Sequence, residues 1–125
     1  MGYKEAIRLD SDREKLGLAI AVAEDINFTV LATKQSDPID YITIQLHGVG
    51  TEPLTLTNLY IKHPVNVGEE ELDEIADLNP NNHIITGDFN CHHTAWGSPK
   101  NDTQGSVVYD LHAGSPFSIR VRPLG

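Results

Sequence analysis

The apolar segments of this chain are short, and turn-forming residues separate each one from the next. The longest, residues 18–23, has the length of a strand and is much shorter than a membrane-spanning helix. Residues 41–46 and 54–61 alternate between apolar and polar side chains, as strands with one buried face do. Glycines and a proline lie between these two segments and predict a hairpin. Together the segments predict a fold built mainly from β-strands.

Two further strands are expected at 16–23 and 28–32, where apolar and β-branched residues are concentrated. Asp25 and Asn27 lie in the turn between them, which suggests that these strands also form a hairpin. The amino-terminal segment favours a strand at 6–9, and a helix there is the alternative.

One segment, 69–78, has apolar residues at helical spacing and acidic residues in its first turn, where the helix dipole favours them. A strand at 83–86 and a second short helix at 106–112 are expected to follow. This order of elements predicts an α/β sandwich with mostly antiparallel strands and one or two helices.

The chain has 125 residues, enough for one domain, and 39% of them are hydrophobic. Eighteen acidic residues against nine basic ones give a formal net charge of −9, the wrong sign for a protein that binds nucleic acid through Lys and Arg. Arg120 and Arg122 are the nearest approach to a basic patch. Cys91 is the only cysteine, so no intrachain disulfide forms, which fits a reducing compartment. The polar start of the sequence indicates no signal peptide.

The segment 84–90, Ile-Ile-Thr-Gly-Asp-Phe-Asn, is the strongest candidate for a functional site. Successive strand residues point to opposite faces, so Asp88 and Asn90 are expected to share one face while Phe89 enters the core. A carboxylate beside a carboxamide suits a metal-bridged phosphate or a water aligned for attack on phosphorus. The alternative is an ordinary turn, which Gly-Asp and Asn also favour.

Other polar residues near this segment have less specific patterns. Tyr60 lies at the end of an expected strand, where its hydroxyl can donate to a phosphate oxygen or simply face water above the core. Cys91, His92 and His93 are adjacent, a poor spacing for zinc, so no zinc site is expected. The two histidines suit the polar rim of a site or structural hydrogen bonds. Trp96 is either a nucleobase-stacking residue or an anchor that packs the loop.

These residues carry a family resemblance. The segments 54–61 and 84–90, with an acidic helix between them, resemble the endonuclease/exonuclease/phosphatase superfamily. The run Asn-Cys-His-His-Thr-Ala-Trp-Gly-Ser at 90–98 is more similar to the endonuclease domain of non-LTR (LINE, jockey-type) retrotransposon reverse-transcriptase polyproteins. The segments 16–22 and 40–44 also resemble it. The similarity extends over roughly residues 16–111, and its motifs are specific in combination.

The resemblance implies a four-layer α/β/β/α sandwich and Mg²⁺-assisted hydrolysis of a DNA phosphodiester, in an intracellular protein with no membrane partner. Asp88 would bind the metal and activate or position the attacking water, Asn90 would hold that water or a phosphate oxygen, and Tyr60 would hydrogen-bond the phosphate. By the same resemblance, the substrate-binding candidates are His92, His93 and Trp96.

The chain also departs from the family. The family has a metal-binding Glu on an early strand and a Ser-Asp-His segment near its end, and neither is found in this sequence. Residues 1–112 are therefore expected to be a partial domain, and 113–125 a tail unlike the family and disordered. The expected function is a fragment of a Mg²⁺-dependent endonuclease that is inactive alone. The alternatives are a non-catalytic remnant or partner-binding module, and a metal-dependent phosphatase of the same superfamily.

Overall fold

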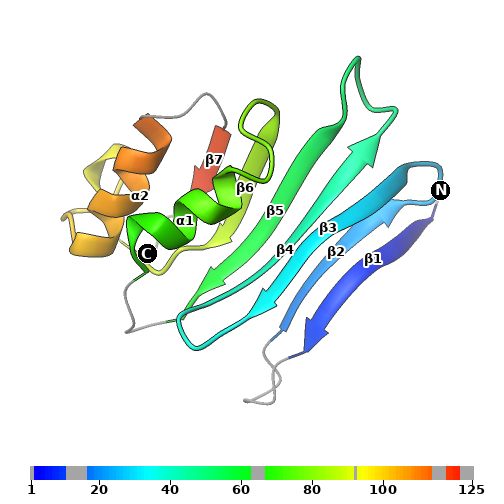
Figure 1. Cartoon of the computed structure of the whole chain (residues 1–125). Helices are drawn as coiled ribbons and strands as arrows, with labels where there is room; N and C mark the ends of the chain where they lie inside the picture. Colours follow the sequence, from blue (N-terminus) through cyan, green and yellow to red (C-terminus); the bar gives the residue numbers. More distant parts are fainter. Residues whose placement is uncertain (1, 11–16, 63–66, 92, 114–117, 122–125) are drawn as a thin grey trace.

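The computed structural model describes residues 2–10, 17–62, 67–91, 93–113 and 118–121 (Figure 1). The elements within these ranges, in chain order, are β1 (Tyr3–Asp10), β2 (Gly17–Ala23), β3 (Asn27–Gln35), β4 (Ile39–His47), β5 (Leu54–Ile61), α1 (Glu69–Ala76), β6 (His83–Asp88), a short 3-10 helix η1 (Thr94–Trp96), α2 (Thr103–Ala113) and β7 (Ser118–Val121).

The strands form two sheets. The larger has the order β3-β4-β5-β6-β7, and β1 and β2 form a separate antiparallel pair. Strands β3, β4 and β5 pair antiparallel, as the alternation and turn residues predicted for β4 and β5. Strands β5 and β6 are parallel, with α1 in the crossover between them, and β7 pairs parallel with β6. The β5-α1-β6 unit places the carboxyl ends of two parallel strands side by side.

The predicted hairpin between β2 and β3 is wrong, because the two strands belong to different sheets. The tight turn after Ala23 carries the chain from one sheet to the other. Ile20 and Val22 of β2 then pack on Ile42 and Ile44 of β4. If β2 were paired with β3 in one sheet, Ile20 and Val22 would lie on the surface of that sheet. In the observed arrangement the two sheets pack face to face and enclose these side chains between them.

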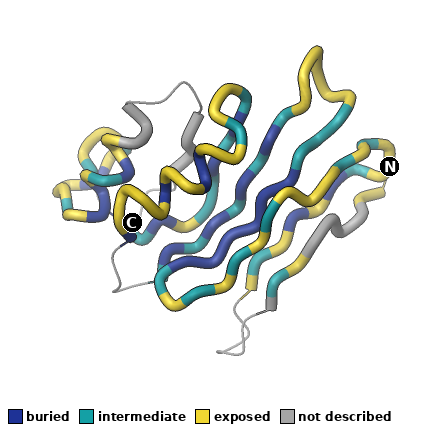
Figure 2. Tube along the Cα trace, in the orientation of Figure 1, coloured by how far each residue is buried: buried dark blue, intermediate teal, exposed yellow. Residues whose placement is uncertain are grey.

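Two apolar cores lie on opposite faces of the larger sheet, and its central strands are correspondingly buried (Figure 2). The sandwich core lies between this sheet and β1–β2. The helix-side core joins the sheet to both helices, and its buried members are Ile39, Tyr41, Leu59, Ile61, Val67, Leu72, Ile75, Ala76, Ile85, Phe89, Cys91 and Val108.

Strand β5 shows how the alternating sequence assigns side chains to these faces. Its burial alternates along the whole strand, and its fully enclosed residues face the helices. Leu59 and Ile61 therefore enter the helix-side core, whereas Asn58 and Tyr60 fall on the sandwich face. Because Tyr60 is near the carboxyl end of β5, its side chain lies on the sandwich face near the end of the strand.

The α/β class with mostly antiparallel pairing is confirmed, and the described residues make three layers: the β1–β2 pair, the larger sheet and the two helices. The expected second helical layer is not among them. The favoured strand near the amino terminus is confirmed as β1. Within the segment 113–125, Ser118–Val121 form β7 on the open edge of β6, and the division into a partial domain and a tail stays a prediction. No helix in the described part of the chain is both long and apolar enough to cross a membrane.

A buried chain of hydrogen bonds crosses the helix-covered face of the sheet. The Oγ1 atoms of Thr43 and Thr57 are 2.6 Å apart, and Thr57 Oγ1 is 2.7 Å from His83 Nε2. His83 is 2% exposed. Burial lowers the pKa of His83 below its usual value of 6.5, and hydrogen bonds to the backbone of Ala76 and Asn79 oppose this shift. His83 therefore links the end of α1 to strands β4, β5 and β6 in its neutral form.

This burial predicts that the protein loses stability in mild acid. A folded-state pKa below 6.5 means that the unfolded chain binds the proton more readily, so the free energy of unfolding falls as the pH drops below 6.5 toward the folded-state pKa. Urea unfolding measured between about pH 7 and pH 5 should show this loss. His83→Gln should flatten the pH dependence, whereas the control His47→Gln, at the end of β4, should retain it. Equal slopes in both variants would contradict the assignment.

Candidate functional site

Tyr60 and Asp88 are direct neighbours across the parallel strands β5 and β6. Their Cα atoms are register partners, one residue from the carboxyl end of β5 and at the end of β6. Register partners on adjacent strands point to the same face, so both side chains lie on the face away from the helices. The predicted placement of Tyr60 on a strand beside the 83–86 strand is therefore confirmed, and Tyr60 shares a face with Asp88.

Gly87 allows β5 and β6 to approach at this point. It lies opposite Leu59 with a φ of +142°. A Cβ atom on Gly87 would overlap the carbonyl oxygen of Leu59 and would lie 2.8 Å from that residue's carbonyl carbon and nitrogen. Only glycine fits, and the side chains that follow it are aligned with β5 as a result.

Asp88 and Asn90 are joined by a turn and not by strand alternation. Strand β6 ends at Asp88, and Asn90 has a left-handed φ of +46°. The backbone N–H of Asn90 donates to Asp88 Oδ1 at 3.1 Å, and the Asn90 side-chain amide donates to the Ile61 carbonyl at 2.6 Å. The predicted reason for their proximity is therefore wrong, because a left-handed residue interrupts the alternation. The hydrogen bonds nevertheless hold Asn90 against the ends of both strands.

Phe89 behaves as predicted. Its side chain is 1% exposed and lies in the helix-side core, while the Asp88 side chain on the preceding residue is exposed. The aromatic ring thus anchors the turn that carries Asp88 and Asn90. Cys91 is also buried in that core, and burial raises the pKa of its thiol to about 12, with smaller contributions from the charges of Asp102 and Asp88. A thiol protonated at neutral pH is neither a nucleophile nor a ready metal ligand.

Two charged residues beside Tyr60 did not stand out in the sequence. Asp40 is the register partner of Tyr60 on β4, and it is 4% exposed. Lys62 lies two residues beyond Tyr60, and its Nζ is 3.1 Å from Asp40 Oδ1. The hairpin predicted from the sequence could have identified Asp40, because a hairpin symmetrical about Gly50 places Asp40 opposite Tyr60. Asp40, Tyr60 and Asp88 thus form one row across three strands.

The other predicted binding residues have structural partners. His93 stacks on Tyr109 of α2 with ring centroids 4.3 Å apart, and its Nδ1 accepts the N–H of Ala95 at 3.0 Å. Trp96 packs against the helix-side core, as expected of a loop anchor. Contact of His93 and Trp96 with a substrate stays a prediction. His92 lies outside the described residues.

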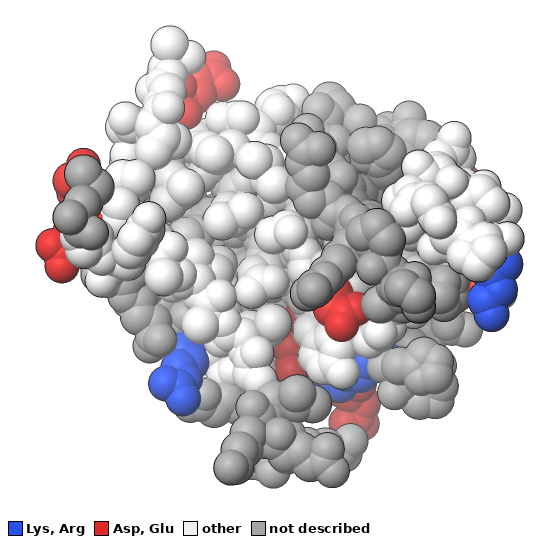
Figure 3. Space-filling view, turned by 180° about the vertical axis from the view of Figure 1, so that it is seen from behind, with Lys and Arg blue, Asp and Glu red and all other residues white. Residues whose placement is uncertain are grey.

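The acidic and basic side chains around the site are few and scattered. Within the described ranges, no group of three or more His, Cys, Asp and Glu side chains is arranged to hold a metal ion. Asp102, a further acid near Cys91, accepts the N–H of Gly105 at 2.7 Å at the start of α2. Figure 3 shows the molecule from behind, and the Lys and Arg side chains coloured there form small separate patches and not a continuous basic surface.

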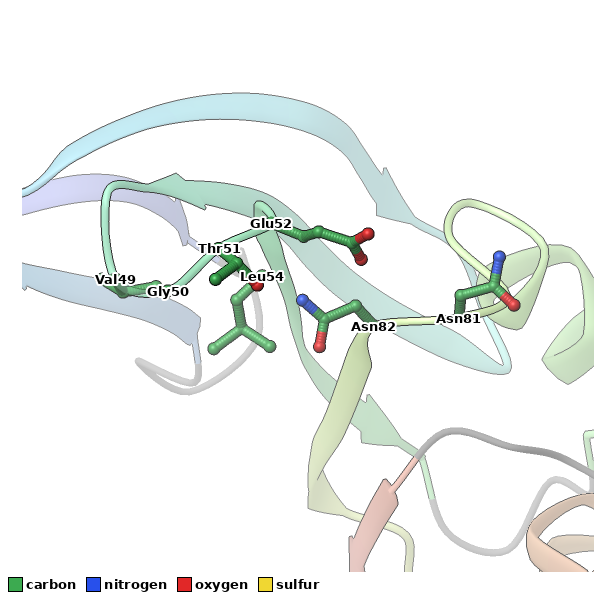
Figure 4. Close-up of a pocket in the computed structure, with 7 residues that line it drawn as sticks. All are labelled: Val49, Gly50, Thr51, Glu52, Leu54, Asn81 and Asn82. Carbon is green, nitrogen blue, oxygen red and sulfur yellow. The ribbon is translucent and has the colours of Figure 1, made fainter.

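A cleft lies at the opposite end of β5 and β6. It has a volume of about 360 Å³ and is lined by the β4–β5 loop and the turn before β6, with Glu52, Asn81 and Asn82 supplying polar groups (Figure 4). Asn82 Nδ2 donates to the Pro53 carbonyl at 2.8 Å. Because β5 and β6 are parallel, this cleft is at their amino ends, away from Tyr60 and Asp88.

Comparison with known proteins gives one match that bears on this arrangement. A family model described as endonuclease-reverse transcriptase matches residues 54–120, which is more than half of the chain. The matched region runs from the start of β5 to β7 and includes Tyr60, Asp88, Asn90 and the helices. The match also includes residues 113–120, which belong to the segment that was expected to be a tail unlike the family. No curated protein and no solved structure gives a significant match.

Proposed function

Because this chain belongs to the endonuclease-reverse transcriptase family, we propose that it is a retrotransposon-type endonuclease domain that binds a DNA phosphodiester at the edge formed by Tyr60 and Asp88. The observation that carries the proposal is the register of β5 and β6, which aligns a phenol and a carboxylate on one face. In α/β sheets the carboxyl ends of parallel strands are the usual place for a ligand.

Each side chain has a chemical role in this proposal. The Asp88 carboxylate is exposed and orients the attacking water by accepting its proton. The Tyr60 hydroxyl donates to a non-bridging phosphate oxygen. The Asn90 side-chain nitrogen is already bonded to the Ile61 carbonyl, so we assign its oxygen to the water. The hydrogen bond from the Asn90 N–H to Asp88 Oδ1 holds Asp88 and Asn90 close together before DNA binds.

The Mg²⁺ ion implied by the family does not fit these residues as a resident ion. Mg²⁺ is usually held by one or two carboxylates together with substrate phosphates and waters. Asp88 is one carboxylate, and the described residues include no cluster that would complete the donor set. We therefore expect Mg²⁺ to bind weakly without DNA, and none of the roles above depends on it.

We further propose that the chain does not cleave DNA by itself. Neither the metal-binding Glu nor the Ser-Asp-His segment implied by the resemblance is present in these 125 residues. Catalytic groups that act as a unit are not replaced by those that remain. We also propose that the three layers are part of a four-layer sandwich whose further helical layer would cover the outer face of β1 and β2.

Nicking of supercoiled plasmid tests the activity. We expect the purified chain to nick plasmid no faster than Asp88→Ala in either Mg²⁺ or Mn²⁺. Asp88 can position the water, but without the metal-binding Glu and the Ser-Asp-His segment no group stabilises the oxygen of the leaving group. The net charge of −9 weakens the encounter with DNA further. Nicking by the wild-type chain that disappears in Asp88→Ala would show that the domain is a working nuclease.

Binding is tested on the same two proteins by an NMR titration with a short DNA duplex at low ionic strength. We expect the amide signals around Tyr60, Asp88 and Asn90 to shift in the wild-type chain and to shift less in Asp88→Ala. The signals of Gly50 and Thr51 in the opposite cleft serve as an internal control and should remain in place. Shifts confined to that cleft, or no shifts, would remove the basis for a phosphodiester site and favour a non-catalytic remnant.

A further inference from the structure

Lys62 has its ammonium group fixed at the edge of the candidate site. The Nζ atom is 3.1 Å from Asp40 Oδ1 and donates to the Ser36 carbonyl at 2.5 Å. The backbone N–H of Lys62 also donates to the Pro38 carbonyl at 3.0 Å, which continues the pairing of β5 with the start of β4. The Lys62 side chain is 27% exposed and that of Asp40 is 6% exposed, so the pair is more sheltered than an ordinary surface ion pair.

The backbone places this ammonium on the face that carries Tyr60. Asp40 is the register partner of Tyr60, and Tyr60 is the register partner of Asp88. Lys62 follows Tyr60 by two residues, with Ile61 between them buried on the helix side. Strand periodicity then returns Lys62 to the sandwich face, where its bond to Asp40 confirms its direction. A positive charge therefore lies at the same edge as the phenol and the carboxylate.

Without a cation this edge would repel a phosphodiester, because Asp40 and Asp88 are both carboxylates. Lys62 offsets the charge of Asp40. Its ammonium has three N–H donors, and the bonds to Asp40 and to the Ser36 carbonyl use two of them. Lysine is a common phosphate ligand that acts as a point charge.

We propose that Lys62 is a phosphate-binding residue of this site and that Asp40 is the positioning residue that holds its ammonium in place. The proposal rests on the proposed function and extends it by naming the group that neutralises the DNA backbone. The competing role is purely structural: the ion pair would only fasten the β3–β4 turn to the end of β5.

The test measures the affinity of the full chain for a fluorescent DNA duplex by anisotropy at several salt concentrations. Lys62→Gln should weaken binding about tenfold, since one charge-assisted hydrogen bond is lost, and should lower the slope of log affinity against log salt by about 1. Lys62→Arg should stay within about threefold of the wild type because it keeps the charge.

Lys34→Gln is the matched control. Lys34 also forms an ion pair, 3.9 Å from Glu74, but on the helix side of the sheet. Its loss should change the affinity for DNA less than twofold, because Lys34 lies on the opposite face of the sheet from the candidate site. The double variant Asp40→Asn/Lys62→Gln removes both charges and should bind as weakly as Lys62→Gln. Recovery of wild-type affinity in the double variant would instead show that Lys62 only neutralises Asp40.

Lysine signals of the unsubstituted chain give a readout that does not depend on how the variants fold. In protein labelled uniformly with ¹³C, the Lys62 Cε–Hε signal should move on titration with duplex while the Lys34 signal remains in place. Wild-type binding at the Tyr60–Asp88 edge that Lys62→Gln leaves unchanged would overturn only the role of Lys62. Absence of duplex binding at that edge in the wild type would overturn the proposed function and the Lys62 role together.

Discussion

Gly87→Ala is expected to destabilise the protein more than most single substitutions. Gly87 has a φ of +142°, and an added Cβ would overlap the backbone of Leu59 on β5. Backbone strain and steric overlap each cost about 1–3 kcal/mol in other proteins, so we expect the free energy of unfolding to fall by about 4 kcal/mol. Chemical denaturation followed by circular dichroism measures this directly.

Gly48→Ala separates the two contributions. Gly48 also has a positive φ, +79°, but no atom lies within 4 Å of the position that its Cβ would take. Only the strain of a left-handed alanine applies there, about 1–2 kcal/mol. Equal losses in the two variants would mean that β5 moves aside freely and that the close approach at Gly87 does not constrain the Tyr60–Asp88 register.

Phe89→Ala is expected to cost about 3–5 kcal/mol, the usual range for removing a buried aromatic side chain and leaving a cavity. Phe89 is 1% exposed and packs in the helix-side core, one residue from both Asp88 and Asn90. We therefore expect the variant to lose stability and also the hydrogen bond from Asn90 N–H to Asp88. Thermal unfolding reports the first effect, and faster amide exchange at Asn90 reports the second.

Phe28→Ala is the comparison for Phe89→Ala. Phe28 is only partly buried, at the rim of the sandwich core on β3. Its truncation should cost less than half as much and should leave amide exchange at Asn90 unchanged. A similar loss of stability in both variants, with exchange at Asn90 unaffected, would show that the ring of Phe89 does not anchor the site.

The sequence predicted well those features that depend on one strand or one helix at a time. The alternation in 54–61 predicted both the burial of β5 and the position of Tyr60 near its end. The acidic first turn predicted α1, and the position of Phe89 after a strand predicted its burial. In each case the relevant physics is the period of the element, which neighbouring residues determine.

Features that depend on contacts between distant segments could not be predicted in the same way. Strands β2 and β3 are adjacent in sequence, yet the sheet to which each belongs depends on which apolar faces pack together. The four residues of β7 have no distinctive pattern, and their pairing depends on the open edge of β6. At Asn90 a single left-handed residue ended the alternation. Lys62 and Asp40 are 22 positions apart, so their ion pair follows only from the register of β4 and β5.

The row of Asp40, Tyr60 and Asp88 combines two kinds of strand pairing. The antiparallel β4–β5 pairing can begin at Leu46 and Leu54, 8 positions apart, whereas every register pair of the parallel strands β5 and β6 is 28 positions apart. Strands β4 and β5 are joined by a short loop, so the Asp40–Tyr60 half can form quickly as a local hairpin. Asp88 reaches its place only after the α1 crossover has closed and β6 has docked parallel to β5, which is a slower event because it carries a larger loop-closure entropy. We therefore expect Asp40 and Tyr60 to be aligned before Asp88 completes the row.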